Sequence, residues 1–260
     1  MKMIREVMRF HDLLYMMVWR DIRVKYKQSI LGVLWAILMP ATIVLAGIVV
    51  KFAMFKVSGK PLSAHDLANV SVRSVPWAFF VASIRFGTNC LTANSNLVTR
   101  VYFPKVIFPL SAILSQFMDF LIACGVLAII LVFLGVSPIW SLLWLPALVA
   151  LLVVLAAGLV IFLSAAGLFF RDVKYLVEMF LTFAIFFTPV FFDASMFGEW
   201  KNLLLLNPVA PILEGIAAAV TGQGGLPLGW LLYSASVSLA ILGGSLLFFE
   251  RVEPLFAESI

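Results

Sequence analysis

Long runs without charge, separated by short polar segments, dominate the pattern of this 260-residue chain. Residues 30–50 carry no charged side chain, and about 20 apolar residues of helix cross a hydrocarbon core of roughly 30 Å. A helix satisfies every backbone hydrogen bond within one lipid-embedded segment, so the pattern predicts an all-α integral membrane fold. The predicted six spans are residues 30–50 (or to 55), a second from near 75 that fades into 92–96, and then 106–136, 139–170, 175–192 and 226–249.

The amino terminus predicts an amphipathic helix that lies in the cytoplasmic interface. Residues 8–19 are apolar but too short to span, and cations that suit anionic headgroups follow at once. We therefore divide the chain into an interfacial segment, 1–29, and a six-helix transmembrane domain, 30–260. A cleaved signal peptide is the alternative, but no small-residue cleavage site follows and a full span comes next. The residues assigned to the interface helix are Trp19, Arg20, Arg23, Lys25 and Tyr26.

Composition supports the membrane class, and the distribution of cations predicts orientation. Hydrophobic residues make up 63% of the chain and charged residues 12%, whereas soluble domains carry about 25% charged residues. With the amino terminus inside, most of the 18 lysines and arginines fall in cytoplasmic segments, which predicts that both termini are cytoplasmic. Cys90 and Cys124 both lie in apolar stretches, where a thiol behaves as a small apolar group.

Ionisable groups at membrane depth are costly and usually have a partner. Arg85 and Asp119 each lie 17 residues from Tyr102 in sequence, so a symmetric hairpin turning there places both roughly 25 Å along their helices. We predict an Arg85–Asp119 ion pair; the alternative is that Arg85 snorkels outward and Asp119 faces an aqueous path. Glu178 follows Lys174 by four residues, which predicts a charge at the cytoplasmic rim, with a gating role as the alternative.

Several motifs, in order along nearly the whole chain, resemble the ABC-2 type permeases that export polysaccharides such as O-antigen, capsule and teichoic acid. The first joins the interface helix to the first span, and the second is the connector between the second and third spans. The matching segments are Trp19–Pro40, Asn94–Leu110, Phe170–Lys174, Thr188–Val190, Asn207–Pro208 and Phe249–Glu258.

The resemblance implies that the connector, about residues 94–109, docks on an ATPase subunit. The residues themselves agree, because Pro104 and Pro109 bound a short polar segment and stiffen its backbone. A plain helix-hairpin turn at the membrane surface is the alternative. The residues that the resemblance assigns to this coupling role are Asn96, Leu97, Val98, Thr99, Arg100, Val101, Tyr102, Phe103 and Pro104.

ATP hydrolysis is expected on another chain. A phosphate-cradling loop ends in Gly-Lys-Ser or Gly-Lys-Thr, and the sole Gly-Lys pair, Gly59–Lys60, is followed by proline. The resemblance implies a homodimer with two copies of a separate ATPase that holds ATP and Mg²⁺. This chain itself is expected to need no cofactor or metal, because His11 and His65 lie far apart without ligand-spaced neighbours.

Aromatic residues and an outer loop are the candidates for the substrate path. Phe180, Phe183, Phe187 and Phe191 recur at helical spacing, and the apolar C–H faces of sugars pack on such rings. Contact with lipid or neighbouring helices is the alternative. Residues 193–225 hold two short apolar runs that predict helices dipping into the outer interface. The resemblance implies an outer gate there, and passive packing is the alternative.

The sequence therefore predicts a permease subunit that moves lipid-linked polysaccharide outward across the bacterial inner membrane. An ABC-2 exporter of a drug or lipid is the alternative within this class. A membrane enzyme acting on lipid-linked sugars is the second class, but the clusters of carboxylates or histidines that it needs are not evident in the sequence. A scaffolding membrane protein is the third, and it has no use for the polar connector.

Overall fold

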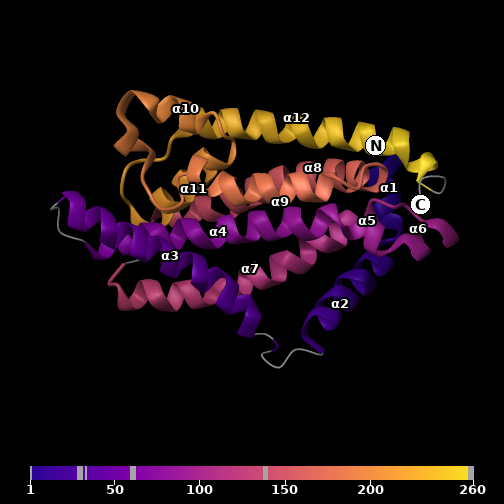
Figure 1. The fold of residues 1–260 in the computed structure, drawn as a ribbon, viewed down its shortest axis with the longest axis horizontal. Helices are drawn as coiled ribbons and strands as arrows, with labels where there is room; N and C mark the ends of the chain where they lie inside the picture. The colour runs from indigo at the N-terminus through magenta and orange to yellow at the C-terminus, as the bar shows by residue number, and fades with distance from the viewer. Residues whose placement is uncertain (1, 28–31, 33, 59–62, 137–139, 257–260) are drawn as a thin grey trace.

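The computed structural model describes residues 2–27, 32, 34–58, 63–136 and 140–256. Over these residues the fold is all-helical, without strands, as predicted. Long helices run side by side along the longest dimension of the molecule, and both termini lie at the same end, beside the short helix α6 (Figure 1).

Four segments in this part of the chain are long and apolar enough to cross a membrane. They are α4 (Ala64–Thr88), α7 (Ile107–Phe133), α8 (Leu145–Phe169) with the preceding turn η1 (Trp140–Trp144), and α12 (Leu228–Val252) with η4 (Glu253–Leu255). They correspond to the second, third, fourth and sixth predicted spans. Helix α3 (Leu34–Ser58) covers most of the first, so six spans in total stays a prediction.

The fifth predicted span is shorter than the sequence suggested. Helix α9 (Val173–Ala184) and the turn η2 (Ile185–Phe187) end at Thr188, whose extended backbone precedes Pro189. Proline disfavours helical geometry in the residue before it. The 12 residues of α9 cover roughly 18 Å, well below the bilayer core.

The segment after α9 folds into η3 (Ala194–Trp200), α10 (Lys201–Leu205) and α11 (Val209–Thr221). Helix α11 is almost wholly buried and packs against α4, α8 and α12, so it belongs to the helix bundle. Its first turn is fastened to the break in α9, because Asn207 Nδ2 donates to Thr188 Oγ1 at 2.9 Å and Asn207 Oδ1 accepts from Val209 N at 3.2 Å.

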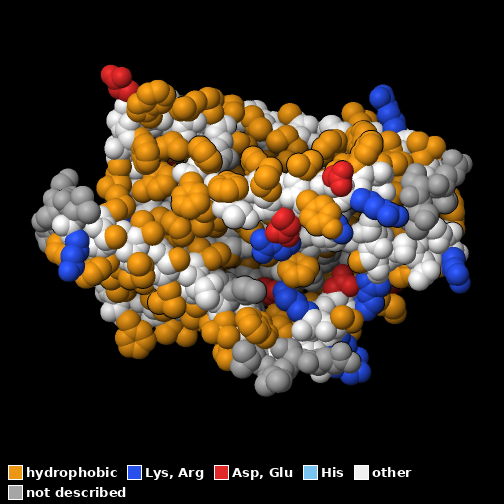
Figure 2. Space-filling view, in the orientation of Figure 1, with side chains coloured by type: hydrophobic (Ala, Val, Ile, Leu, Met, Phe, Trp, Pro, Cys, Tyr) orange, Lys and Arg blue, Asp and Glu red, His pale blue; other side chains and the backbone are white. Residues whose placement is uncertain are grey.

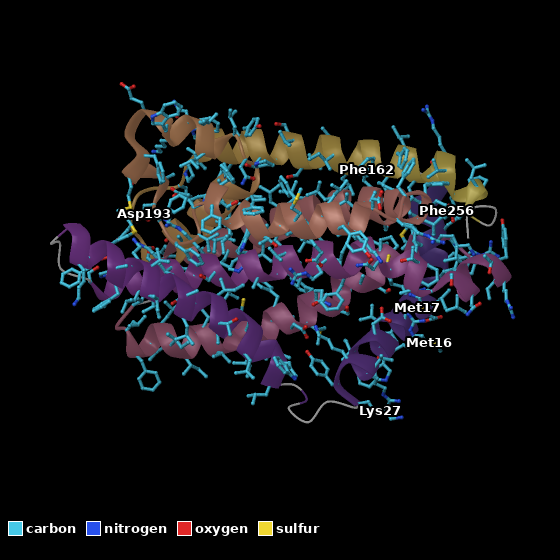
Figure 3. All side chains as sticks on the ribbon, viewed as in Figure 1. Met16, Met17, Lys27, Phe162, Asp193 and Phe256 are labelled. Atoms are coloured by element: carbon cyan, nitrogen blue, oxygen red, sulfur yellow. The ribbon has the colours of Figure 1, made fainter. Side chains whose placement is uncertain are left out.

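The amino-terminal helix α1 (Lys2–Arg9) lies at the end that carries both termini, and α2 (His11–Lys27) begins there and slants toward the middle of the molecule (Figure 1). Helix α2 packs against α7. The connector between α4 and α7 contains two short helices, α5 (Cys90–Ala93) and α6 (Ser95–Arg100). A buried cluster ties this end together, with members from α2, the connector, α8 and the carboxyl terminus, among them Met17, Phe103, Phe108, Phe249 and Phe256; Figure 3 labels Met17 and Phe256.

Candidate functional site

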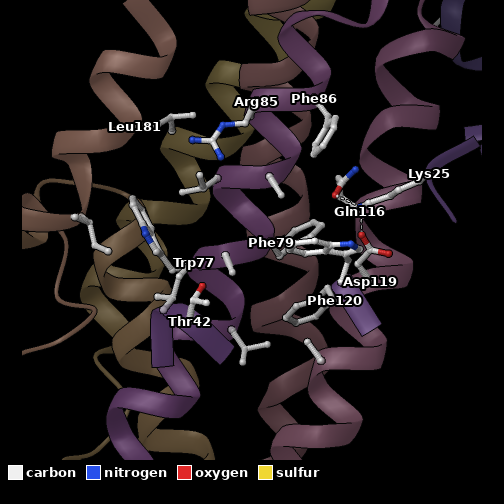
Figure 4. Close-up of a pocket in the computed structure, with 18 of the residues that line it drawn as sticks. Lys25, Thr42, Trp77, Phe79, Arg85, Phe86, Gln116, Asp119, Phe120 and Leu181 are labelled. Carbon is white, nitrogen blue, oxygen red and sulfur yellow. Dashed lines mark hydrogen bonds and ion pairs between the residues drawn. The ribbon is translucent and has the colours of Figure 1, made fainter. Parts of the chain in front are cut away.

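A cavity of about 600 Å³ lies across one face of α4, between α7 and α9, with α3 closing one side (Figure 4). We call it the α4 cavity. Ala78 and Ala82 line it from α4, and their small side chains leave space for the cavity. Trp77 flanks this face on the side of α9, and Phe79 flanks it on the side of α7 (Figure 4). Its size is within the range of about 300–1,000 Å³ typical of small-molecule sites.

A polar group on α7 lines the same cavity and is bound by α2. Lys25 Nζ donates to Gln116 Oε1 at 3.1 Å and forms an ion pair with Asp119, and the Tyr26 hydroxyl donates to Asp119. Gln116 is 4% exposed. Burial is the largest cause that raises the pKa of Tyr26 above its ordinary value, and the hydrogen bond to Asp119 is the second cause. This hydroxyl therefore stays a proton donor.

The predicted ion pair between Arg85 and Asp119 is wrong in this structure. Arg85 Nε instead donates to both carboxylate oxygens of Glu178, at 2.8 and 2.9 Å, and Asp119 is taken by α2. The hairpin is not symmetric about Tyr102, because α5 and α6 occupy the connector. Arg85 therefore sits only about 5 Å from the end of α4, whereas Asp119 sits about 18 Å into α7.

Glu178 of α9 therefore has Arg85 of α4 as its ion-pair partner, although Lys174 lies only one helical turn before it. Arg85 also lines the α4 cavity, and both side chains of the Arg85–Glu178 pair are 45% exposed. Figure 2 shows charged side chains gathered near the middle of this face and toward the end with the termini, among mostly hydrophobic side chains elsewhere.

The connector assigned to coupling forms a short helix followed by an extended stretch. Helix α6 covers Asn96 to Arg100, and Tyr102 beyond it is 100% exposed. Phe103 turns the other way and packs on Phe108, with ring centroids 5.4 Å apart. An exposed tip on a buried base is a suitable shape for a docking element.

The base of the connector is held by the carboxyl-terminal turn. Lys105 N donates to Glu253 Oε1 at 2.7 Å. Burial lowers the pKa of the Lys105 ammonium, and the nearby Glu253 carboxylate opposes that shift. Sequence reasoning missed this contact, because 148 residues separate the two positions and neither lies in a recognisable pair motif.

The predicted interface-helix residues divide between two faces of α2. Trp19 is exposed, with the Arg23 guanidinium carbon 5.2 Å from its ring centroid, and Arg20 bonds its neighbour Asp21 at 2.8 Å. Lys25 and Tyr26 turn inward to Asp119 instead. The charge pattern predicts that Lys25 reaches lipid headgroups, but in the structure it pairs with the partly buried carboxylate of Asp119. Figure 3 labels Lys27, the last residue of α2.

The predicted aromatic path is only partly one surface. Phe180, Phe183 and Phe187 are exposed on α9 and η2, whereas Phe191 lies beyond the helix break. Phe191 is half-buried and so close to Gly47 that a β-carbon there would meet its ring at 2.8 Å. The break at Thr188 therefore separates Phe191 from the other three rings.

Sequence reasoning also missed a cluster of five charged residues, which we call the outer charge cluster because its members lie in or beside segments that the sequence predicts to be outside. Arg73 of α4 pairs with Asp193 at 2.7 Å and with Glu214 of α11 at 3.5 Å, and it donates to Phe192 O at 3.0 Å. Lys51 of α3 pairs with Asp193 at 3.3 Å and with Asp66 at 3.6 Å. The members are Lys51, Asp66, Arg73, Asp193 and Glu214.

This cluster fastens the chain after α9 to three helices. Arg73 and Lys51 are both 5% exposed, which makes their partners necessary. Burial alone would raise the pKa of Asp193, but the two cations overcome it and lower that pKa below the ordinary value. The signal available in the sequence was three acidic residues in segments predicted to be outside: Asp66 and Asp193 lie at the edges of apolar runs, and Glu214 lies within one.

Comparison with known proteins adds a family and several relatives. The family described as "ABC-2 type transporter" matches residues 12–221. A relative from Myxococcus xanthus named "O-antigen export system permease protein RfbA" is 26% identical over 262 residues, covering 100% of this chain and 99% of the relative. A relative of the same name from Klebsiella pneumoniae is 26% identical over 250 residues, covering 95% and 94%.

Proposed function

Because the chain belongs to the ABC-2 type transporter family, we propose that it is the permease subunit of an exporter that moves lipid-linked polysaccharide outward across the bacterial inner membrane. The observation that carries the proposal is the family match over most of the chain. The names of relatives aligned over at least 95% of it favour O-antigen or a similar glycan, such as capsule.

The proposed assembly is a homodimer with two ATPase subunits, which hold ATP and Mg²⁺. Its support is the connector: α6 lies at the end of the molecule that carries both termini (Figure 1), and the exposed Tyr102 follows α6 by two residues. Placing that end in the cytoplasm agrees with the distribution of cations. In this arrangement the ATPases meet α6 and the amino-terminal helices together.

The proposed transport step begins when the ATPase subunits close. They press on α6, and the push passes through Phe103 and Pro104 into α7. A second route runs through α2, which is tied to α7 by Lys25 and Tyr26. Movement of α3 and α9 across the dimer interface then opens the path, with α10 and α11 at the outer gate.

The test is purification of the tagged chain with a co-expressed ATPase from the same gene neighbourhood. We expect a stoichiometric complex in which Arg100→Ala and Tyr102→Ala abolish or uncouple ATP hydrolysis. Lys201→Ala, an exposed cation in the outer segment, is the matched control and should leave hydrolysis unchanged. A chain that purifies alone and converts a lipid-linked sugar without ATP would instead establish a membrane enzyme.

A further inference from the structure

The α4 cavity combines features that suit one class of ligand. Its aromatic walls come from α4 and α7, where Trp77, Phe79 and Phe120 line it. Gln116 and Asp119 line it from α7 with an amide and a carboxylate, and Arg85 lines it from α4 with a partly exposed guanidinium group (Figure 4). Sugar rings present apolar C–H faces to aromatic rings, while their hydroxyls bond to amide, carboxylate and guanidinium groups, which offer both donors and acceptors.

The charges around the cavity favour a neutral ligand. Lys25 is paired with Asp119, and Arg85 is paired with Glu178. An anionic ligand would have to compete with a carboxylate for either cation, which costs the charge-assisted bonds already present. Hydroxyl groups can instead join these pairs, because a carboxylate oxygen accepts more than one hydrogen bond.

Asp119 also connects the cavity to α2. Lys25 binds its Oδ2 and Tyr26 binds its Oδ1, so both oxygens are contacted from α2. A hydroxyl in the cavity that donates to Asp119 shares or displaces one of these bonds. A second contact, Ser111 Oγ to Asp21 Oδ2 at 3.2 Å, keeps the rest of α2 on α7, so the change falls on the end of α2 near Lys25.

We propose that the α4 cavity binds a neutral sugar unit carried on an apolar tail, and that Asp119 reports its occupancy to α2. The half-exposed pair of Arg85 and Glu178 marks the opening through which such a ligand enters. The proposal deepens the proposed export function, on which it rests for its biological meaning, by giving the substrate a contact site inside each protomer. Binding and the response of α2 are both measurable without any ATPase.

The binding test uses the full chain in phosphatidylcholine nanodiscs and three amphiphiles with one octyl tail: octyl glucoside, octyl phosphate and octyl tetraethylene glycol ether. Intrinsic tryptophan fluorescence and thermal shift report binding. We expect octyl glucoside to bind about tenfold more tightly than the other two, the size expected for one or two buried hydrogen bonds. Equal binding of glucoside and ether would show a site for tails alone, and strongest binding of octyl phosphate would show an anion site. Either result overturns the proposal.

Matched variants locate the site. Gln116→Leu keeps the shape and removes the amide, so the preference for glucoside should disappear, whereas Gln223→Leu in the exposed turn before α12 should keep it. Ala82→Leu fills the cavity without removing a polar group and should also block binding. If Gln116→Leu fails to fold, Ala82→Leu alone tests whether the ligand binds in the α4 cavity. Undiminished glucoside binding in a folded Ala82→Leu chain would contradict the proposal.

A fluorophore attached to the Val24→Cys variant tests whether ligand binding in the α4 cavity changes the surroundings of α2, on which this position is exposed. The Cys124→Ala background removes one of the two native thiols. Burial raises the pKa of the remaining Cys90 thiol, which keeps it unreactive. Octyl glucoside should change the label's emission, and Tyr26→Phe should reduce the change while binding persists. Tyr15→Phe, on the exposed face of α2, is the control. An unchanged signal with confirmed binding would refute the report, independently of whether an ATPase complex forms.

Discussion

At the scale of single residues, charged side chains act as fasteners between helices. The outer charge cluster joins α3, α4, α11 and the chain after α9, and its two cations, Lys51 and Arg73, are nearly inaccessible to solvent. The Arg85–Glu178 pair is half exposed, and such pairs contribute only about 0–1 kcal/mol. Stability should therefore depend on the outer cluster far more than on the Arg85–Glu178 pair.

Replacing Arg73 tests this ranking. Arg73→Met removes a nearly inaccessible cation from the partly buried carboxylates of Asp193 and Glu214 and leaves only Lys51 beside Asp193, so we expect a loss of about 3–5 kcal/mol in the free energy of unfolding. Arg85→Met should cost about 1 kcal/mol or less. Thermal unfolding of both variants in the same detergent makes the comparison. Equal losses would mean that the cluster contributes no more than a surface pair.

The lowered pKa of Asp193 predicts a pH dependence. Its folded-state pKa lies below the ordinary value of 3.8, so its contribution is complete above about pH 4 and fades as pH falls through the folded-state pKa. Lys51 and Arg73 face it as cations, and Asp66 and Glu214 are the carboxylates of the same cluster.

The measurement is the difference in melting temperature between the native chain and Asp193→Asn from pH 7 to pH 3. We expect a constant difference down to about pH 4 and a narrowing one below it. Glu199→Gln, an exposed acid in the same segment, should show no difference across the range. A gap that widens on acidification would reverse the assigned sign.

At the scale of elements, charge-free length predicted helices well and helix ends poorly. The apolar runs formed α7, α8 and α12, in which no proline lies beyond the first turn. The sequence pattern extends the fifth span to residue 192 because hydrophobicity continues past Pro189, whereas in the structure the helical segment ends before that proline. The 13 residues of α11 are too few to span, which predicts an interfacial helix, yet α11 packs inside the bundle.

The partners of charged residues were not predictable from sequence counts. The predicted depth of Asp119 in the membrane indicates that it has a partner. That this partner is Lys25 depends on how α2 folds back onto α7, which the sequence does not reveal. The connector residues were found from motif order, and their anchor at Glu253 was not, because that contact is made only in the folded chain.

The anchor of the connector offers a test at this scale. Glu253→Gln keeps an oxygen that accepts from Lys105 N, so coupling should persist, whereas Glu253→Ala removes the acceptor. In the complex of the Glu253→Ala chain with its ATPase, the stimulation of ATP hydrolysis by transport substrate should be several-fold weaker than in the native complex. Glu250→Ala, exposed on α12, is the control. Equal behaviour of the alanine and glutamine variants would leave Glu253 without a positioning role.

Close packing of α8 on α12 depends on a glycine. A β-carbon on Gly158 would approach Leu242 N to 2.9 Å and Leu242 Cα to 3.0 Å, and backbone atoms cannot turn aside. Gly158→Ala should therefore cost about 1–3 kcal/mol through strain. Gly243→Ala, with open space at its β-carbon, should be neutral or stabilising by up to about 1 kcal/mol. Thermal stability in detergent distinguishes them, and equal stabilities would contradict this packing.

At the scale of the whole molecule, two routes lead from one end of the bundle to the α4 cavity. One passes from α6 through Phe103 into α7, and the other passes from α2 through Lys25 to Asp119. The outer charge cluster holds the other side of the path, where the chain leaves α9. In the proposed transport step, force applied at the end with both termini would pass along these contacts to the helices that line the cavity (Figure 1).

The central claim is that this chain carries polysaccharide outward when a partner hydrolyses ATP. The most direct measurement places the chain and its ATPase in proteoliposomes with a lipid-linked polysaccharide and follows the glycan across the bilayer with a membrane-impermeant lectin. The account predicts transfer that requires ATP, stops with a hydrolysis-deficient ATPase and falls with Tyr102→Ala. Transfer that proceeds equally without ATP or without the ATPase would contradict it.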